Sequence, residues 1–387
     1  MLLAQRMSRL GTETAFEVLA KARALEAKGQ QIVHLEIGEP DFDTPAHIKE
    51  AAKKALDDGF THYGPSAGLP ELRAALAADA GKRRGIELTP DMVVVTPGAK
   101  PIMFFSILAV AEEGDEIIYP NPGFPIYESV INFIGAKPVP VPLREEKNFS
   151  FDPEELISLI TPKTKMIILN SPHNPTGGVL SKQDLETVAE VAGDRGIWIL
   201  TDEVYINFLY EGKFETISRL KDMMEQTIIL DGFSKSYAMT GWRIGYGIMP
   251  PRLAEHLTRM QTNSNSCTNT FVQRAALAAV EGPQEPVAEM AAAFKERRDV
   301  IVEGLNNIEG ISCLKPKGSF YVFPNIKATG KSSAWLEGYL LETAGVACLS
   351  GTSFGRFGEG YLRFSYANSV EQIKIALEKI DDALRKL

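Results

Sequence analysis

Residues 231–246 read Asp231-Gly-Phe-Ser-Lys235-Ser-Tyr-Ala-Met-Thr-Gly-Trp-Arg243-Ile-Gly-Tyr246. The run before them, 227–230, is apolar and typical of a buried parallel strand, and residues 244–249 form a second apolar run. A lysine held at a strand end among small residues loses solvent, which lowers its pKa and frees the amine as a nucleophile. For an isolated Ser-Lys-Ser, a solvent-exposed loop lysine is the favoured alternative.

The stretch 234–246 resembles the pyridoxal-phosphate attachment signature of the class I/II aminotransferases, the fold-type I family, and the chain is similar to the aspartate and aromatic aminotransferases of its broad bacterial and archaeal branch. The resemblance implies that Lys235 is catalytic and forms a Schiff base with pyridoxal 5'-phosphate. It also implies that Arg243 binds the cofactor phosphate and that Ser234 belongs to the cofactor site.

The same resemblance predicts an α/β fold. A large domain holds a mainly parallel seven-stranded sheet between helices, and a smaller α+β domain accompanies it. The expected division is an N-terminal arm at 1–13, a small domain at 14–46 and 283–387, and a large cofactor-binding domain at 47–282. A length of 387 residues suits two domains.

A phosphate site is predicted where the apolar stretch 92–96 is followed by Gly98-Ala99-Lys100 and a helix that opens with Pro101. A strand, a glycine turn and a helix opened by proline present free amide groups to an anion. Such turns also occur without a ligand. The resemblance assigns the amides of Gly98, Ala99 and Lys100 to the cofactor phosphate, and the sequence leaves open whether the Lys100 side chain contributes charge or points outward.

Four further residues are candidates for holding the cofactor ring. Asp202 follows an apolar strand, and a carboxylate beside a pyridine nitrogen keeps that nitrogen protonated. An aromatic side chain stabilises a planar ring by stacking, which favours Phe124, although a core phenylalanine is the alternative. By resemblance, Asn174 and Tyr205 hydrogen-bond the ring oxygen, and Asn174 also contacts the substrate.

The candidate residues follow successive predicted strands, which end at residues 96, 119, 170, 201 and 230. Ligands in open α/β sheets collect outside the carboxyl ends of strands. The spacing therefore predicts one shared crevice. In this region we interpret His173 as a loop residue without a catalytic role and Glu203 as a structural or solvated acid.

Two residues are candidates for binding the substrate carboxylate. Arg363 lies among apolar neighbours in a predicted strand at 361–367, and an arginine is costly to bury without an anionic partner. A structural salt bridge is the alternative. Gly38 lets a ligand approach the backbone, although an ordinary turn would also account for it. The resemblance assigns both residues to the substrate α-carboxylate.

The resemblance also implies a homodimer with shared active sites, in which Tyr63 reaches the cofactor phosphate of the partner subunit and the 262–270 loop approaches the partner's site. The dicarboxylate-specific branch has an arginine where this chain has Met260, so strict aspartate or glutamate specificity is not expected. We expect Phe16, Asn263 and residues 12–14 to shape the side-chain pocket together with Met260.

Composition limits the other partners. A net charge of −9 without basic runs argues against nucleic acid and anionic membranes. No apolar stretch approaches the ~18 residues of a membrane span, and the first ten residues carry no signal-peptide core. The three widely spaced cysteines indicate free thiols in a reducing cytoplasm, and no metal site is expected.

The predicted activity, taken from the resemblance, is an aminotransferase that moves the amino group of an L-amino acid to a 2-oxo acid in a ping-pong cycle, with Lys235 as general base. The donors considered are aspartate, glutamate, alanine and aromatic amino acids. A β-lyase of the C–S lyase type, or a cyclopropane-carboxylate synthase, is the alternative within the fold. An effector-binding module of a transcription regulator is disfavoured because such a chain needs a basic DNA-binding domain ahead of residue 14.

Overall fold

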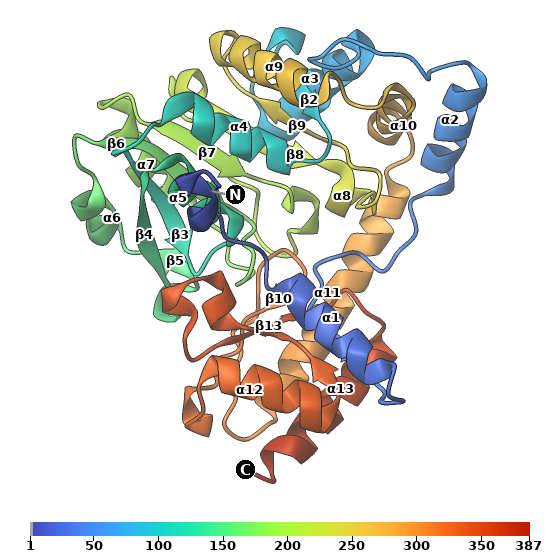
Figure 1. Ribbon diagram of the computed structural model, residues 1–387, viewed down its shortest axis with the longest axis vertical. Coiled ribbons are helices and arrows are strands. Elements are labelled where there is room, and N and C mark those ends of the chain that lie inside the picture. The colour runs from blue at the N-terminus through green and yellow to red at the C-terminus, as the bar shows by residue number, and fades with distance from the viewer. Residues whose placement is uncertain (1–2) are drawn as a thin grey trace.

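The computed structural model describes residues 3–387, and a large central sheet dominates its upper part (Figure 1). The strand order is β2-β9-β8-β7-β6-β3-β4-β5. Strands β8, β7, β6, β3 and β4 run parallel, β9 runs antiparallel to β2 and β8, and β5 runs antiparallel to β4. The bounds are β2 Val93–Thr96, β3 Glu116–Asn121, β4 Lys137–Arg144, β5 Ser150–Phe151, β6 Thr164–Asn170, β7 Trp198–Asp202, β8 Thr227–Gly232 and β9 Gly245–Ile248. The predicted α/β fold with a mainly parallel sheet is confirmed.

Within residues 3–387 this sheet has eight strands, one more than predicted. The extra strand is β5, which has two residues and folds back on the end of β4, pairing Phe151 with Leu143. Asn148 makes the reversal possible because its φ of 54° lies in the left-handed region that asparagine tolerates. So short a strand carries no periodicity that a sequence could reveal.

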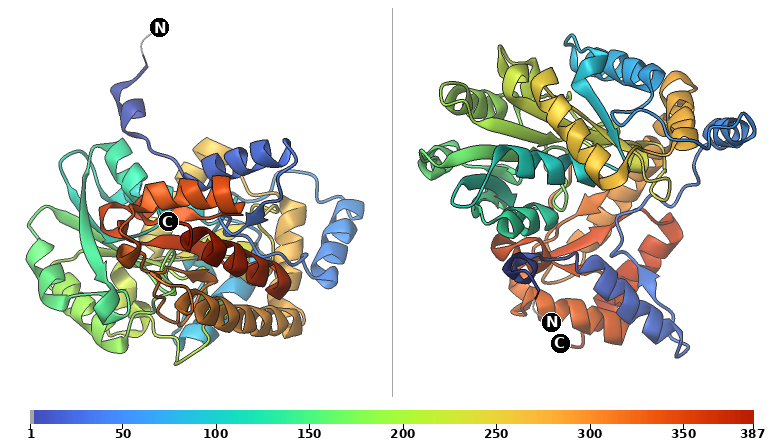
Figure 2. Two further views of the ribbon diagram at one scale, coloured as in Figure 1. Left: turned by 90° about the horizontal axis from the view of Figure 1, so that it is seen from below. Right: turned by 45° about the horizontal axis from the view of Figure 1, so that its top comes forward.

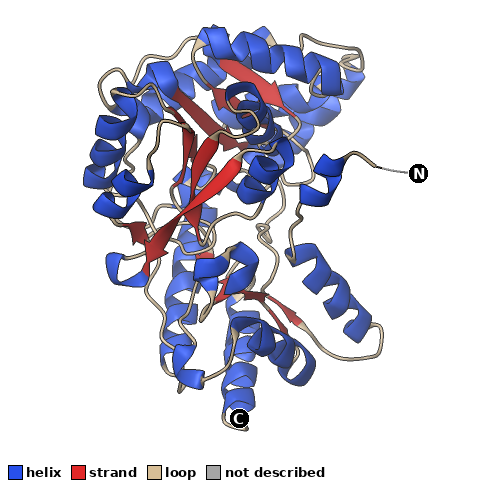
Figure 3. Cartoon of the chain, turned by 60° about the vertical axis from the view of Figure 1, so that its left-hand side comes forward, coloured by secondary structure: helices blue, strands red, loops and turns tan. Residues whose placement is uncertain are grey.

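Helices cover both faces of the sheet, as Figure 3 shows. Side chains alternate between the faces of a strand, so in β6 Met166 and Ile168 pack with one set of helices while Ile167 and Leu169 pack with the other. The first set is α4 (Lys100–Val110), α5 (Ile126–Ile134) and α9 (Pro251–Asn265); the second is α3 (Pro70–Arg84), α6 (Pro153–Leu159), α7 (Lys182–Gly193) and α10 (Thr270–Glu281), with α2 (Ala46–Asp57) outside α10.

A second region is built from the two ends of the chain. The bounds of its elements are α1 Ala15–Glu26, β1 Val33–His34, α11 Glu285–Asn306, β10 Tyr321–Val322, α12 Ser333–Tyr339, β11 Val346–Ala347, β12 Leu349–Ser350, β13 Leu362–Ser365 and α13 Val370–Leu384. Strand β1 pairs in parallel with β11, and a small antiparallel sheet has the order β10-β13-β12. Both views in Figure 2 show α1 beside the C-terminal elements, and α11 connects the two regions.

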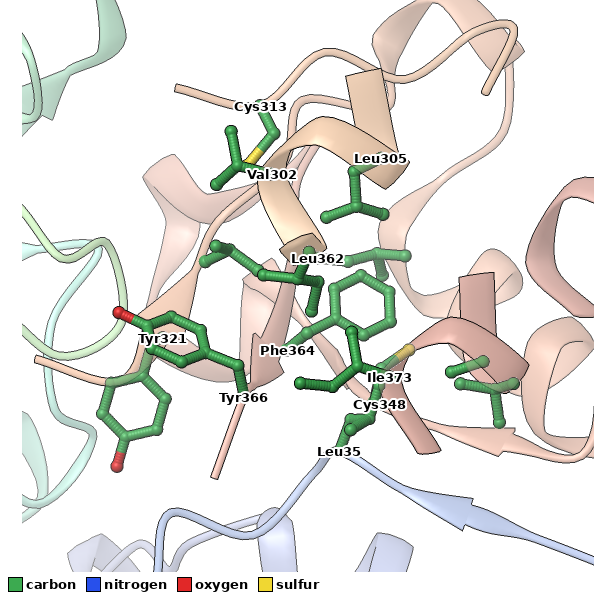
Figure 4. Packing of buried hydrophobic residues seen from close by; sticks show 14 of the residues in the cluster. Leu35, Val302, Leu305, Cys313, Tyr321, Cys348, Leu362, Phe364, Tyr366 and Ile373 are labelled. Atoms are coloured by element: carbon green, nitrogen blue, oxygen red, sulfur yellow. The ribbon is translucent and has the colours of Figure 1, made fainter. Parts of the chain in front are cut away.

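The core of this second region brings together residues from both ends of the sequence (Figure 4). Leu35, just after β1, packs in one cluster with Leu362 and Phe364 of β13 and with Ile373 of α13. Each fully buried aliphatic side chain contributes about 2 kcal/mol relative to an exposed one. The polypeptide just after β1 is thereby fixed, and that segment carries Gly38.

Candidate active site

A cavity of about 550 Å³ lies outside the carboxyl ends of the parallel strands. The last residues of three neighbouring strands line it, Asn170 of β6, Asp202 of β7 and Gly232 of β8. Most of the residues singled out from the sequence meet there: Gly38, Ala99, Lys100, Phe124, Asn174, Asp202, Tyr205, Ser234, Lys235, Arg243 and Arg363. Residues up to 325 positions apart along the chain thus share one crevice.

Lys235 projects into the cavity from α8 (Phe233–Ser236), a single helical turn that begins directly after β8. Its Nζ donates a hydrogen bond of 2.5 Å to the carbonyl oxygen of Gly38. Burial lowers the pKa of Lys235 to about 8, although the charges of Glu39 and Glu13 oppose the shift. The side chain is therefore an amine in the cavity rather than a solvated loop lysine.

Arg363 of β13 is buried without a carboxylate partner among the ion pairs of residues 3–387. Its Nη1 donates to Asn174 Oδ1 at 3.4 Å, its Nη2 donates to the Glu36 carbonyl oxygen, and its Nε has no partner in the described structure. The guanidinium lies 4.5 Å from the ring centre of Tyr321. A buried fork with spare donors suits a carboxylate ligand.

Gly38 lies in a tight space beside Tyr321. A side-chain carbon at Gly38 would lie 2.0 Å from the Tyr321 hydroxyl oxygen, so only glycine fits. The same hydroxyl lies 2.9 Å from that of Tyr205. Gly38, Tyr205 and Tyr321 therefore form one wall of the cavity, with the Lys235 amine against it.

Asp202 accepts a hydrogen bond of 2.6 Å from the Tyr127 hydroxyl and one of 3.3 Å from the Val204 amide. Burial raises the pKa of Asp202 to about 6, and the Tyr127 hydrogen bond opposes that rise. A cation near this carboxylate would favour its ionised form. Asp202 is thus a buried carboxylate at the end of β7 that suits a cationic partner in the cavity.

The turn before α4 packs against Arg243. Gly98 has a φ of +89°, and a side-chain carbon there would lie 2.1 Å from Arg243 Nη2. Arg243 has a φ of 52°, and its Nη1 donates to the Thr240 carbonyl at 2.7 Å. A guanidinium fork beside the free amides that begin α4 forms a cradle for a phosphate dianion.

The cavity also offers the other features that a phosphorylated pyridine aldehyde needs: an amine, a carboxylate, and the Phe124 ring on its wall. The donor set therefore fits pyridoxal phosphate. Among residues 3–387, no group of three or more histidine, cysteine, aspartate or glutamate side chains is arranged to hold a metal ion.

Five expected residues are absent from the cavity lining of a single chain: Thr12, Tyr63, Gly98, Met260 and Asn263. The Tyr63 side chain is 89% exposed. Met260 packs against the buried hydrophobic residues of α4, α5 and α9. The side-chain amide of Asn263 donates a hydrogen bond to the Arg259 carbonyl at 2.8 Å. Of the residues expected at the side-chain pocket, Phe16 and Glu13–Thr14 do line the cavity.

Two neighbours of the strand ends are structural. His173 is buried, its Nδ1 lies 2.8 Å from Thr176 Oγ1, and burial lowers its pKa to about 3, so it stays neutral. Glu203 is buried and forms an ion pair with Arg84. Of the two interpretations considered for Glu203, the structural one is correct.

Tyr127 and Tyr321 are among the cavity residues that were not predicted. Tyr127 lies three positions after Phe124, and the two rings pack edge-on with centres 5.6 Å apart. Phe124 precedes α5, so no helical period in the sequence links the two residues. Tyr321 lies in the alternating segment 318–324, but no sequence feature shows which face meets Gly38.

Comparison with known proteins agrees with this geometry. Residues 30–380 match the family described as aminotransferase class I and II. The chain is 44% identical to an aspartate aminotransferase of Pyrococcus horikoshii, over 92% of each chain. It is 40% identical to aromatic-amino-acid aminotransferase 2 of Thermococcus litoralis, over 100% of this chain and 99% of the relative. The solved structure of an alanine aminotransferase from Pyrococcus furiosus superposes with a TM-score of 0.95 at 34% identity, covering 100% of both chains.

Proposed function

The chain belongs to the class I and II aminotransferase family. We propose that Lys235 is the central residue of its transamination reaction: it attaches the cofactor as a Schiff base, and it moves the substrate proton. The enzyme transfers an amino group between an amino acid and a 2-oxo acid, and the family depends on pyridoxal 5'-phosphate. The assignment rests on one observation: the Lys235 amine and the Arg363 guanidinium, which has no carboxylate partner among residues 3–387, line the same cavity.

The substrate is held at its α-carboxylate by Arg363 and the backbone at Gly38. When bound, pyridoxal phosphate supplies an aldehyde for the amino group and a ring that accepts electrons from the α-carbon. Burial lowers the pKa of Lys235 to about 8, which favours the neutral amine that can take the α-proton. The wall of Gly38, Tyr205 and Tyr321 restricts the position of the amine relative to the substrate.

The other cavity residues hold the cofactor. Arg243 and the Gly98, Ala99 and Lys100 backbone bind the phosphate, supported by the close approach of Gly98 to Arg243. Asp202 holds the ring nitrogen in its protonated form, supported by the hydrogen bond from Tyr127. The remaining contacts come from Asn174 and Tyr205 at the ring oxygen, Phe124 at the ring face, and Ser234.

The amino donor is aspartate, glutamate, alanine or an aromatic amino acid. The support is that the similar proteins are named aspartate, aromatic and alanine aminotransferases. The same names do not favour a β-lyase. A cavity of about 550 Å³ has room for side chains of each of these sizes.

The active unit is a homodimer in which Tyr63 serves the cofactor phosphate of the other subunit. The support is the 89% exposure of Tyr63, together with exposed Leu3, Met7, Leu10 and Phe16 near the N-terminus. Each chain divides into an arm at 1–13, whose residues 1 and 2 lie outside the described part of the structure, a large domain at 47–282 and a small domain made of 14–46 and 283–387. That division is supported by the separate core that joins Leu35 to β13 and α13.

We place the enzyme in the cytoplasm. The support is the three cysteines, Cys267, Cys313 and Cys348, which are all free thiols and suit a reducing compartment. Among the helices within residues 3–387, none combines the length and apolar character needed to span a bilayer.

The test is the near-ultraviolet and visible absorbance of purified protein supplied with pyridoxal phosphate. Wild type should develop the band of a lysine-bound cofactor, one amino acid should bleach it, and the corresponding 2-oxo acid should restore it. Lys235→Ala should lack the lysine-bound band. Lys213→Ala changes an exposed lysine and serves as the matched control.

Two results would contradict the proposal. A normal lysine-bound band in Lys235→Ala would exclude Lys235 as the attachment residue. Release of ammonia from the amino acid, without amination of an added 2-oxo acid, would show a lyase instead of a transaminase.

A further inference from the structure

The segment before α1 folds across one side of the cavity. The short helix η1 (Gln5–Arg9) lies beside α5 (Figure 1), where Arg9 Nε donates to the Asn132 carbonyl at 2.9 Å. The amide of Gly11 then donates to Ser129 Oγ, also at 2.9 Å. These anchors place the next residues, from Glu13 to Phe16, on the cavity wall.

Glu13 directs its carboxylate at Lys100. The Glu13 Oε1 and Lys100 Nζ atoms form an ion pair, in which the Glu13 side chain is 18% exposed and that of Lys100 is 52% exposed. Lys100 Nζ also lies 5.4 Å from the ring centre of Phe124. The cavity thus has a fourth cation beside Lys235, Arg243 and Arg363, and the chain's own carboxylate already neutralises it.

The negative charge of Glu13 extends further into the cavity. Burial dominates the pKa values of Lys235 and Arg363 and lowers both, and Glu13 is among the nearby charges that raise them. The carboxylate is therefore within electrostatic range of the two groups assigned to catalysis and to the substrate carboxylate. A ligand carboxylate that replaced Glu13 at Lys100 would likewise lie within electrostatic range of Lys235 and Arg363.

We propose, building on the aminotransferase assignment above, that Glu13 is a specificity-determining residue whose carboxylate occupies Lys100 until the distal carboxylate of a dicarboxylic substrate displaces it. A substrate with an uncharged side chain leaves the pair intact. A dicarboxylate such as aspartate or 2-oxoglutarate must replace the Glu13–Lys100 ion pair with its own ion pair to Lys100. Its affinity is therefore lower than it would be without the Glu13 carboxylate, by roughly the free energy of the Glu13–Lys100 pair. For a partly exposed pair that loss is about fivefold.

A purely structural role for Glu13, as an anchor of the N-terminal segment, predicts something different. Loss of an anchor would change the affinity for all ligands alike, because the wall of the cavity would loosen for each of them. Loss of a competing carboxylate changes the affinity only for ligands that carry a second carboxylate. The two roles are therefore separated by a pair of ligands that differ in that one group.

The experiment measures binding to the cofactor-loaded enzyme by calorimetry, with succinate as the dicarboxylate and butyrate as the four-carbon monocarboxylate. Glu13→Gln keeps the shape of the side chain and removes its charge. We expect it to strengthen succinate binding about fivefold and to change butyrate binding less than twofold. Glu17→Gln removes an exposed carboxylate four residues along the same segment and should change neither.

A second measurement ties the effect to Lys100. In a Lys100→Gln background, Glu13→Gln should no longer strengthen succinate binding, because the cation for which the two carboxylates compete is gone. Unchanged succinate affinity in Glu13→Gln, an equal gain for butyrate, or a gain that persists without Lys100 would each overturn the proposal.

Kinetics separate this proposal from the functional assignment. In Glu13→Gln the KM for aspartate should fall relative to that for alanine. If the wild-type enzyme transaminated no amino acid, the assignment would fail, whereas the succinate and butyrate affinities would still report on Glu13.

Discussion

Arg84 Nη2 lies 2.7 Å from Glu203 Oε2, and the two side chains are only 0% and 2% exposed. The same nitrogen lies 3.1 Å from Asp231 Oδ2. Glu203 directly follows Asp202 at the end of β7, and Asp231 lies near the end of β8, just before the turn that carries Lys235. One buried guanidinium from α3 therefore joins the two strand ends that position the Asp202 carboxylate and the Lys235 amine.

Arg84→Leu should lower the free energy of unfolding by about 3 to 5 kcal/mol, because it leaves the Glu203 carboxylate buried without a cation and leaves Asp231 with only the Arg83 guanidinium, 3.4 Å away. Urea unfolding measures the change. Lys54→Ala, which removes an exposed pair with Asp58, is the control and should cost less than about 0.5 kcal/mol. A loss below about 1 kcal/mol for Arg84→Leu would show that water or rearrangement compensates the carboxylates.

Tyr127→Phe should shift the pH dependence of activity. The Tyr127 hydrogen bond lowers the pKa of Asp202 against the larger effect of burial, which raises it to about 6. Without that bond the Asp202 carboxyl group protonates at higher pH. The acidic limb of the plot of kcat/KM against pH should therefore shift to higher pH by about one unit. Tyr339→Phe, whose hydroxyl donates to a backbone carbonyl far from the cavity, should leave the profile in place.

His34 should make the free energy of unfolding decrease with rising pH in the alkaline range. Its Nδ1 lies 2.7 Å from Glu36 Oε1, and the hydrogen bond to Glu36 is the main cause that raises the pKa of His34 to about 9. The pKa of His34 in the folded protein exceeds the unfolded value of 6.5. The contribution of protonated His34 to the free energy of unfolding is therefore complete below about pH 6.5 and is lost as the pH rises through about 9.

His34→Gln should therefore lower the free energy of unfolding by about 1 kcal/mol at pH 6, a value reduced for the solvent exposure of the ring, and by almost nothing at pH 10. Denaturant unfolding at the two pH values measures the difference. His256→Gln replaces an exposed histidine and serves as the control. An equal loss at both pH values would mean that the imidazole acts by packing and not by charge.

Arg363→Lys should raise the KM for amino acids by about 10- to 100-fold, because a point charge cannot reproduce the two parallel donors of a guanidinium. Steady-state kinetics measures this. The absorbance of the bound cofactor should remain, since Arg363 is assigned to the substrate. Loss of the cofactor band would place Arg363 in the cofactor site instead.

Tyr63 provides a test of shared active sites. In a homodimer of either variant, Tyr63→Ala or Lys235→Ala, both active sites are impaired. A mixed dimer of the two variants has one impaired site and one intact site, in which Lys235 comes from the Tyr63→Ala subunit and Tyr63 comes from the Lys235→Ala subunit. After subunit exchange between equal amounts, about one quarter of all sites should be intact. Activity that stays at the level of the separate variants would contradict the exchange of Tyr63 between subunits.

Much of the fold could be predicted because the hydrophobic pattern is local. The helical periodicity of residues 46–57 and 370–384 predicts two helices, and the structure has them at Ala46–Asp57 and Val370–Leu384. The short apolar run at 32–37 predicts a strand, but the strand is limited to Val33–His34, because the chain pairs with β11 over those two residues and then turns into the cavity at Gly38.

Strand β4 could not be predicted in this way. Prolines 138, 140 and 142 alternate with Val139, Val141 and Leu143. Proline has no amide hydrogen and normally argues against a strand. Here every second residue is proline, so the amides of the residues between them remain available on one side, which suits a strand near the edge of the sheet.

The candidate site was predictable to the extent that its residues follow strand ends. Asp202 and Lys235 meet because β7 and β8 are parallel neighbours. The hydrogen bond from Tyr127 to Asp202 and the pairing of Glu13 with Lys100 join separate elements through side-chain geometry. No periodicity in the sequence encodes such contacts.

The hydrogen bond from Arg363 to the carbonyl of Glu36 also has a consequence for the order in which the protein is made. Glu36 leaves the ribosome 327 residues before Arg363. The large sheet between them can fold first, whereas the pocket proposed for the substrate carboxylate forms only after Arg363 has been synthesised. A chain that terminates before Arg363 would therefore lack this pocket even if its sheet had folded.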